Sequence, residues 1–581
     1  MAKNIFSRSS DGGRYGYVFE KYGIFFVFLQ RKHCIKKMLL RRYITLMLCL
    51  LPCITAFAQE AKKETFLIVS RPQFREGLQL FVQWKRQEGF EVEELYVDTN
   101  SCFLVKEMMR PLFDSTNVHV SMPQYILLVG DHEQLEAFHG SMPMNGESHF
   151  TDLPYADFMG DYLPETMLGR WPVNDTAELR IVVEKTLRYE QFVDMDTAQL
   201  QRILLVAGRE YGAPAPTTTN GQVNYLKREV KCAHPEMDTL CWYNPASDSL
   251  GAAIASAIGQ GACLLNYTGH GIVDGWSHPM MNANAIATLE AIQPTIYVNN
   301  CCQSNTFTGT GFGEQLLRMP VGGAVGVIGA TNSTLWAEDY YWSVGPKNPF
   351  SLEPVFDSAA PGAFDGLVRS ERTTATLGEL LRNGNMAVMA SGTNYAKYYW
   401  EIYCLLGDPS LKPWIGVPQP MMLVVDSVEI GQREVSVECT PGARITVVQG
   451  DELLGVVDIG DLGRATIELW RAIDTLPLVV TATGINLEPR VVTIPLSTGI
   501  GIGRIECGEL SIEVSPNPSN GRVYLLSHEK MTVYVTNALG RCVGTLLLLG
   551  DETVEWRAPE GLYFATGITD KGTVTKKIII K

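Results

Sequence analysis

Residues 263–271 read Cys-Leu-Leu-Asn-Tyr-Thr-Gly-His-Gly, and residues 295–302 read Thr-Ile-Tyr-Val-Asn-Asn-Cys-Cys; these two stretches decide the fold. Each is an apolar run of strand length that ends in polar or reactive side chains. A helix-length segment separates them, as in a parallel sheet buried on both faces. In open α/β sheets, the loops beyond the carboxyl ends of the strands form the binding crevice. The sequence therefore predicts a site that contains His270 and the pair Cys301 and Cys302.

A thiol and an imidazole at neighbouring strand ends suit nucleophilic catalysis. Adjacent strands lie about 4.8 Å apart, so the two groups can face one another. The imidazole of His270 would take the thiol proton and later protonate the leaving amine. Gly271 leaves space beside the ring, and backbone amides near it suit oxyanion support. The alternative interpretation is a surface histidine in a tight turn beside two small, buried cysteines.

The flanking sequence predicts two α/β subdomains, at residues 59–201 and 202–415. Each contains strand-length apolar runs separated by helix-length segments, which is typical of a parallel sheet with helices on both faces. The runs are residues 66–69, 92–97, 125–129, 203–206 and 322–329.

After Pro418 the pattern becomes all-β. Short runs rich in Val, Ile and Thr alternate with turns, which predicts an Ig-like β-sandwich at 416–496. A linker rich in Gly, Ser and Thr follows at 497–509, and a final β module at 510–581.

Composition excludes several classes of protein. At about 150 residues per domain, 581 residues predict three to four domains. A chain that is 46% hydrophobic and 19% charged is not mainly disordered. A net charge of −15 argues against a nucleic-acid binder that acts through a basic field. No Gly-x-Gly-x-x-Gly opens a helix after the first strand, so a Rossmann oxidoreductase is excluded.

The amino-terminal residues 1–58 read as an over-long start followed by a signal peptide. Residues 38–58 have a basic head, a short apolar core and Ala56-Phe57-Ala58, which predicts cleavage after Ala58. A membrane anchor is the alternative, which the short apolar core and the lack of a following stop-transfer pattern disfavour. No later stretch is long and apolar enough to span a bilayer. The 13 cysteines are too sparse for a disulfide scaffold, and none has the spacing of a zinc site, so no metal is assigned.

Residues 263–271, taken with the Cys302 region, resemble the gingipain-type cysteine peptidases. That family has a caspase-like fold, with a strand ending in Thr-Gly-His-Gly and a cysteine about thirty residues later. Residues 163–170 resemble its segment with an acidic residue before an apolar-Gly-Arg run, and residues 406–411 resemble the end of its peptidase domain. The resemblance covers about residues 64–415. It implies a cysteine endopeptidase that acts on protein or peptide substrates and requires no cofactor.

The resemblance also implies roles for residues. His270 matches the catalytic histidine of the family. Cys302 is preferred as the nucleophile because the family places an aromatic residue five positions after its cysteine, where this chain has Phe307. Cys301 stays the alternative nucleophile, since Gln303 follows the pair where a glycine is commoner in the family.

Carboxylates complete the implied site. Glu165 matches the acidic residue that orients the histidine; a surface loop carboxylate is the alternative, and Asp161 is a lesser candidate. Named gingipains cut after Arg or Lys, which requires a carboxylate in the first specificity pocket. The candidates for that carboxylate are Asp175, Asp274, Glu338 and Asp339. Members can bind structural calcium, and the acidic loops here are compatible with it.

The module at 510–581 resembles the C-terminal sorting domain of type IX secretion in Gram-negative bacteria. The matching features are Ser515-Pro516-Asn517-Pro518, Gly521-Arg522-Val523 and a basic-apolar end at 575–581. The resemblance implies passage through the periplasm, contact with the type IX machinery, and a secreted or surface-attached product.

Three interpretations follow for the whole chain. The first is a secreted or surface-attached cysteine endopeptidase that cuts after a basic residue. The second is a catalytically inactive gingipain-like surface binding protein, which has no need of Cys302, His270 and Glu165 together. The third is a processing peptidase of the secretion machinery itself, which the sorting tail disfavours because such tails also mark ordinary cargo.

Overall fold

The computed structural model describes residues 64–581, except for short gaps. The gaps are residues 114–121, 143, 145–147, 211–216, 290–292, 348, 369–375, 497–511, 528–529, 538–541, 551–552 and 570–571. The predicted signal peptide and the predicted linker at 497–509 lie outside the described residues.

A ten-stranded sheet organises the α/β region, in the order β2-β1-β3-β6-β15-β14-β13-β9-β7-β8. One parallel set comprises β1 (Glu64–Ser70), β2 (Phe90–Tyr96), β3 (Tyr125–Val129) and β6 (Met167–Trp171). The other comprises β7 (Arg202–Ala207), β8 (Asp238–Trp242), β9 (Leu264–Thr268), β13 (Thr295–Asn300) and β14 (Ala324–Ala330). The two predicted parallel sets are therefore confirmed.

The strand β15 (Tyr403–Gly407) joins the two sets into one mixed sheet, which the sequence analysis did not predict. It pairs antiparallel with β14 and parallel with β6. The two sets consequently run in opposite directions. The carboxyl ends of β7, β9 and β13 lie at the same edge of the sheet as the amino end of β6.

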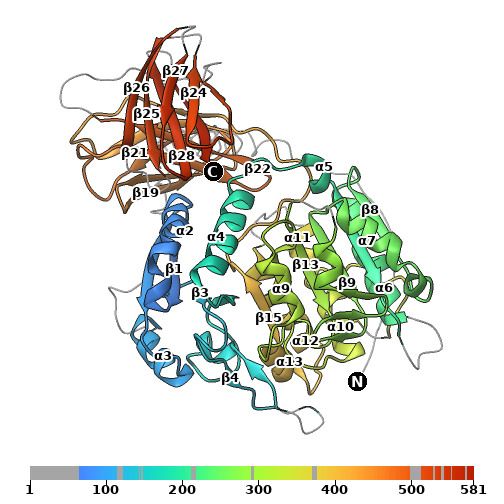
Figure 1. The fold of residues 1–581 in the computed structure, drawn as a ribbon. Coiled ribbons are helices and arrows are strands. Elements are labelled where there is room, and N and C mark those ends of the chain that lie inside the picture. Colours follow the sequence, from blue (N-terminus) through green and yellow to red (C-terminus); the bar gives the residue numbers. More distant parts are fainter. Residues whose placement is uncertain are drawn as a thin grey trace, which may run out of the picture. The chain divides into compact units, whose positions relative to one another are not determined.

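Helices cover both faces of the sheet because alternate strand residues point to opposite sides. Leu265, Tyr297 and Val327 belong to a core with α2 (Arg75–Gln87), α4 (Thr176–Glu190) and α9 (Phe312–Arg318). Their neighbours Leu264 and Ile328 belong to a core with α6 (Thr217–Ala233), α10 (Trp336–Val344), α12 (Leu377–Ala390) and α13 (Ala396–Ile402). Figure 1 shows this α/β region in blue to orange. The predicted fold class is confirmed.

Two all-β modules follow the α/β region, as predicted. The first has a sheet of β16 (Leu423–Val425), β17 (Glu434–Cys439) and β20 (Arg464–Glu468). Its second sheet comprises β18 (Arg444–Gln449), β19 (Glu452–Asp458), β21 (Leu478–Gly484) and β22 (Leu487–Ile494), and one apolar core joins both sheets. The Ig-like assignment and the domain boundaries stay predictions.

The last module also has two sheets around one apolar core. One contains β23 (Glu513–Ser515), β24 (Arg522–Leu526) and β27 (Val554–Arg557). The other contains β25 (Lys530–Asn537), β26 (Cys542–Leu549), β28 (Gly561–Thr569) and β29 (Gly572–Ile580).

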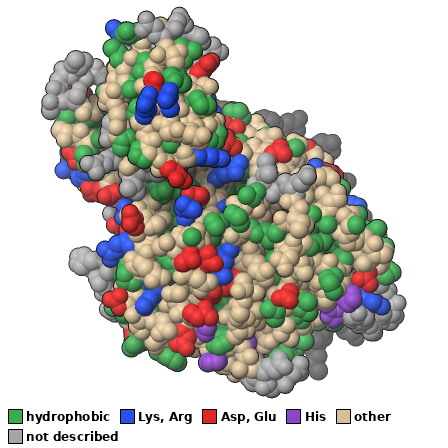
Figure 2. All heavy atoms as spheres, in the orientation of Figure 1, with side chains coloured by type: hydrophobic (Ala, Val, Ile, Leu, Met, Phe, Trp, Pro, Cys, Tyr) green, Lys and Arg blue, Asp and Glu red, His purple; other side chains and the backbone are tan. Residues whose placement is uncertain are grey.

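The described residues include no helix with the length and apolar character needed to cross a membrane. Both acidic and basic side chains lie on the face of the molecule seen in Figure 2.

Candidate active site

The predicted histidine and cysteines follow two paired strands. In the register of β9 and β13, Thr268 is paired with Asn300, the last residue of each strand. The amide of Gly269 donates to the carbonyl of Asn300 at 3.4 Å. His270 and Cys302 therefore emerge from neighbouring strands at one edge of the sheet.

Gly271 allows the histidine loop to lie against the cysteine pair. A Cβ atom at this position would lie 2.2 Å from the carbonyl oxygen of Cys302 and 2.6 Å from Sγ of Cys301. Both distances are too short for any side chain, so the close approach requires glycine. This gives Gly271 a steric role, and its part in oxyanion support stays a prediction.

His270 is held by its backbone and packed at its ring. Its carbonyl oxygen accepts hydrogen bonds from the Tyr267 hydroxyl at 2.8 Å and from the Ser277 hydroxyl at 3.1 Å. Its ring packs edge-on against Trp336, with 4.9 Å between centroids. Partial burial, together with the nearby His278, lowers the pKa of His270. The imidazole is therefore mainly neutral at neutral pH and can accept a proton.

The two cysteines occupy different environments. Cys301 is fully buried in the core between the sheet and its helices, and burial raises the pKa of its thiol. Cys302 is partly exposed, and its Sγ accepts the amide N–H of Thr334 at 3.2 Å. Burial also raises the pKa of Cys302, while the Thr334 amide opposes this rise. Exposure and an amide donor favour Cys302 as the nucleophile, an assignment that stays a prediction.

The backbone after Cys302 takes a left-handed turn. Gln303 has φ of 56°, and its amide donates to the carbonyl of Asn332 at 3.0 Å. Glycine adopts this conformation more easily than a residue with a side chain. The turn is therefore a position that favours glycine, and Gln303 adopts it at an energetic cost.

A buried carboxylate, Asp339, lies behind Cys302. Its Oδ2 accepts the hydroxyl of Thr334 at 2.7 Å, and its Oδ1 accepts the hydroxyls of Tyr399 at 2.8 Å and Tyr403 at 2.9 Å. Burial raises the pKa of Asp339 to about 7, against the effect of these three donors. Thr334 touches both Asp339 and the thiol, and so connects them.

The other three candidates for the specificity carboxylate have different surroundings. Asp175 caps α4 by accepting the amides of Ala177 and Glu178. Asp274 lies exposed in the turn between β10 (Gly271–Ile272) and β11 (Gly275–Ser277). Glu338 accepts the hydroxyl of Thr393. Of the four, Asp339 has the contact with Thr334 that leads to Cys302.

Glu165 lies just before β6, which three strands separate from β9. At about 4.8 Å per strand, β6 and β9 are about 19 Å apart. The Glu165 carboxylate accepts the amide of Phe158 at 2.7 Å, and Asp157 accepts the amides of three residues of the same loop. These contacts stabilise the loop, and the orienting role of Glu165 stays a prediction.

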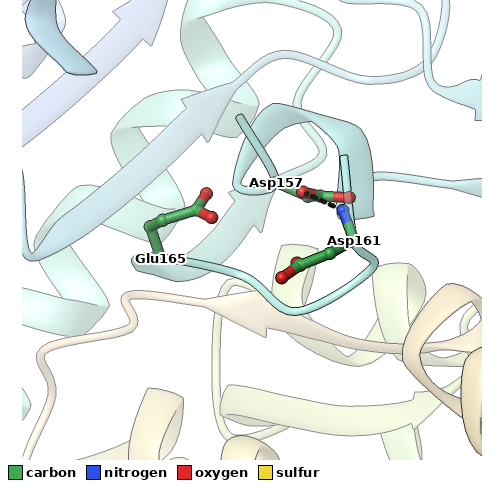
Figure 3. A group of neighbouring side chains, drawn as sticks. All are labelled: Asp157, Asp161 and Glu165. Atoms are coloured by element: carbon green, nitrogen blue, oxygen red, sulfur yellow. Dashed lines mark hydrogen bonds between the residues drawn. The ribbon is translucent and has the colours of Figure 1, made fainter. Parts of the chain in front are cut away.

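The same loop gathers three carboxylates. Ligand oxygens of Asp157, Asp161 and Glu165 lie within 4.8 Å of one another (Figure 3). Calcium in proteins takes six to eight oxygen ligands. Calcium binding by the acidic loops stays a prediction.

The sequence analysis did not single out Glu210. This residue follows β7, the neighbour of β9, and Ala207 is paired with Thr268 at the strand ends. Its carboxylate accepts the amides of Thr218 and Thr219, each at 3.2 Å. A polar residue after a strand-length apolar run was the available signal. Glu210 becomes a candidate for the site only because β7 is paired with β9, and the sequence does not show that pairing.

Comparisons with known proteins find matches for two parts of the chain. Residues 59–414 match the model of Peptidase family C25, and residues 513–581 match that of a secretion system C-terminal sorting domain. The sorting domain and the family both support a secreted or cell-surface protein.

Curated relatives come from Porphyromonas gingivalis. Lys-gingipain W83 is 28% identical over 427 residues, which cover 70% of this chain and 24% of that protein. Gingipain R2 is 21% identical over 543 residues, covering 90% of this chain and 68% of that protein. The chain thus spans about a quarter of the length of the Lys-gingipain that it matches.

A solved structure has the same fold. The crystal structure of the Arg specific cysteine proteinase gingipain R superposes with a TM-score of 0.64 at 21% identity, covering 76% of this chain and 99% of that one. The family match spans most of the chain and includes both strands of the candidate site. The chain therefore belongs to Peptidase family C25.

Proposed function

We propose that the chain is a cysteine endopeptidase in which Cys302 is the nucleophile and His270 the general base. The observation that carries the proposal is the packing of the turn at Gly271 on the backbone of the cysteine pair. Two paired strand ends thereby deliver an imidazole and a thiol to one edge of the sheet. Membership of the family supports the same activity.

The reaction follows from these groups. His270 removes the proton from Sγ of Cys302, and the thiolate attacks the carbonyl carbon of the scissile peptide bond. His270 then gives this proton to the leaving amine, and a thioester joins the substrate to Cys302. Water, deprotonated by His270, hydrolyses the thioester and restores the thiol.

A carboxylate near His270 would fix the orientation of the imidazole and stabilise its protonated form. Glu165 is the residue that the resemblance implies. Glu210 is a second candidate, because β7 adjoins β9 whereas β6 does not. The variants Glu165→Gln and Glu210→Gln separate the two. The orienting residue is the one whose loss lowers kcat about a hundredfold or more with little change in KM.

We propose a basic residue at P1, with Asp339 as the carboxylate that selects it. The relatives include proteins named for Lys specificity, and a solved relative is described as Arg specific. Asp339 is linked to Cys302 through Thr334. A carboxylate accepts about four hydrogen bonds, so three hydroxyl donors do not saturate it.

The function is tested by comparing matched cysteine variants for peptide cleavage and for labelling by a thiol-directed warhead. Cys302→Ala is expected to abolish both peptide cleavage and labelling by a thiol-directed peptide warhead, whereas Cys301→Ala retains much of both. A panel of peptides that differ only at P1 is expected to show cleavage after Lys or Arg. Labelling of Cys301 instead would contradict the assignment of the nucleophile, and an inert wild type would favour the binding-protein alternative.

The sorting domain supports export by the type IX machinery, which would be a partner through residues 510–581. The same domain disfavours a role as a processing peptidase within that machinery. Substrates are therefore proteins or peptides outside the cell.

A further inference from the structure

One residue connects the nucleophile to the buried carboxylate. The amide of Thr334 donates to Sγ of Cys302 at 3.2 Å, and its Oγ1 lies 3.7 Å from the same sulfur. That hydroxyl donates to Oδ2 of Asp339 at 2.7 Å. The thiol and the carboxylate are therefore separated by a single hydroxyl group.

The carboxylate is enclosed by hydroxyl groups. Asp339 is 2% exposed and accepts the hydroxyls of Tyr399 and Tyr403 in addition to that of Thr334. In the described part of the chain, no Lys or Arg side chain forms an ion pair with it. The charge of Asp339 is thus screened by dipoles and is not neutralised by a protein cation.

Several titratable groups besides His270 act electrostatically on Asp339 or Cys302. Glu338 is the carboxylate nearest to Asp339 in sequence and acts on it electrostatically, as do the two tyrosines. Cys301, Tyr267 and Tyr403 interact in the same way with Cys302. None of these groups carries a positive charge.

A negative charge at Asp339 opposes formation of the thiolate. Burial raises the pKa of Cys302 and the amide of Thr334 lowers it, while the charge of Asp339 raises it further. Two negative charges this close repel each other strongly in a partly buried site. Neutralising Asp339 would remove this repulsion.

We propose that Asp339 and Thr334 make the reactivity of Cys302 depend on the occupant of the specificity pocket. A bound lysine or arginine side chain pairs with Asp339, and the Cys302 thiol then loses its proton to His270 more readily. This inference rests on the proposed function, in which Asp339 selects the basic P1 residue. Thr334 is a positioning residue, because its backbone amide contacts the sulfur and its hydroxyl contacts the carboxylate.

The consequence is an enzyme whose nucleophile is restrained until a suitable substrate arrives. Above about pH 7, a peptide with an apolar P1 residue would leave Asp339 charged and the thiol mainly protonated. Selectivity would then act on the chemical step as well as on binding.

The experiment measures the alkylation rate of Cys302 by iodoacetamide at pH 8, with mass spectrometry to distinguish Cys302 from Cys301. Asp339 is mainly ionised at this pH, because its pKa lies at about 7. n-Butylamine, which represents a lysine side chain and leaves the thiol accessible, is expected to speed alkylation about tenfold. 1-Butanol, at the same concentration and ionic strength, is expected to have no effect. An equal response to both additives would overturn the proposal.

Two variants, one at Asp339 and one at the neighbouring Glu338, test whether Asp339 carries the response to amine. Asp339→Asn is expected to react faster than the wild type without amine and to be insensitive to it. Glu338→Gln, the matched control on the same helix, is expected to respond like the wild type. An amine response retained in Asp339→Asn, or lost in Glu338→Gln, would overturn the role of Asp339.

Thr334→Val keeps the amide donor to sulfur and removes the hydroxyl. Its alkylation is expected to respond less to amine than that of the wild type, and an unchanged response would overturn the part assigned to Thr334. Failure of the inference differs from failure of the proposed function. In the first case the wild type still cuts after Lys or Arg while the amine has no effect, and in the second no peptide of the P1 panel is cut.

Discussion

The turn after Cys302 shows how one residue is constrained by its position in the fold. The left-handed conformation of Gln303 costs a residue with a side chain about 1–2 kcal/mol. Glycine avoids this cost but loses more backbone freedom on folding. Gln303→Gly is therefore expected to raise the free energy of unfolding by about 0.5–1 kcal/mol, measured by urea denaturation.

Gln83→Gly is the matched control for this variant. Gln83 lies within α2, where the backbone is helical and glycine is expected to lower stability by about 1 kcal/mol. A loss of stability in both variants would mean that the turn at Gln303 stores no strain.

At the scale of elements, two carboxyl groups interact between α9 and the loop after β3: Glu314 of α9 and Asp131 of the loop. Glu314 of α9 is fully buried, and burial together with Asp131 raises the pKa of Glu314 to about 9, while Arg318 opposes this rise. In the folded protein Glu314 thus keeps a proton up to about pH 9, whereas in the unfolded chain it loses that proton near pH 4.5.

The sign of the pH dependence follows. Between about pH 5 and 9 the folded state holds one proton more than the unfolded state, so stability falls as pH rises, by about 1.4 kcal/mol per unit. Glu314→Gln, which stays neutral, is expected to remove this decline in urea titrations at pH 6 and 8.5. Glu178→Gln, which changes another partner of Arg318, is expected to keep the wild-type slope. A steep decline in Glu314→Gln would assign the pH dependence to other groups.

Elements also show what the sequence could and could not predict. The buried runs that became β9, β13 and β14 were readable because apolar residues continue over strand length. The joining strand β15 was not, since a five-residue run does not reveal its partner or its direction. Thr334 and Glu210 were missed for the same reason, because their importance comes from contacts between segments distant in sequence.

At the scale of the whole molecule, the sorting domain has an apolar core of its own. Such a module can be recognised for export without disturbing the catalytic region. Deleting residues 510–581 is expected to leave active enzyme in the periplasm, while the full chain yields surface or released protein that lacks about its last seventy residues. Cell fractionation and mass spectrometry of the mature carboxyl terminus measure both. Unchanged export of the shortened chain, or an intact Lys581 on the surface form, would contradict this role.

The opposite directions of the two strand sets have a practical consequence for protein engineering. Loops that leave the carboxyl ends of β1, β2 and β3 open on the edge remote from His270, one strand length or about 15–20 Å away. An affinity tag inserted at residues 98–100, after β2, is therefore expected to leave kcat/KM within about twofold of the untagged enzyme. The same tag at 273–274, between β10 and β11, would stand beside His270 and is expected to abolish cleavage. The amino-terminal half of the sheet thus offers attachment points on the edge opposite the candidate site.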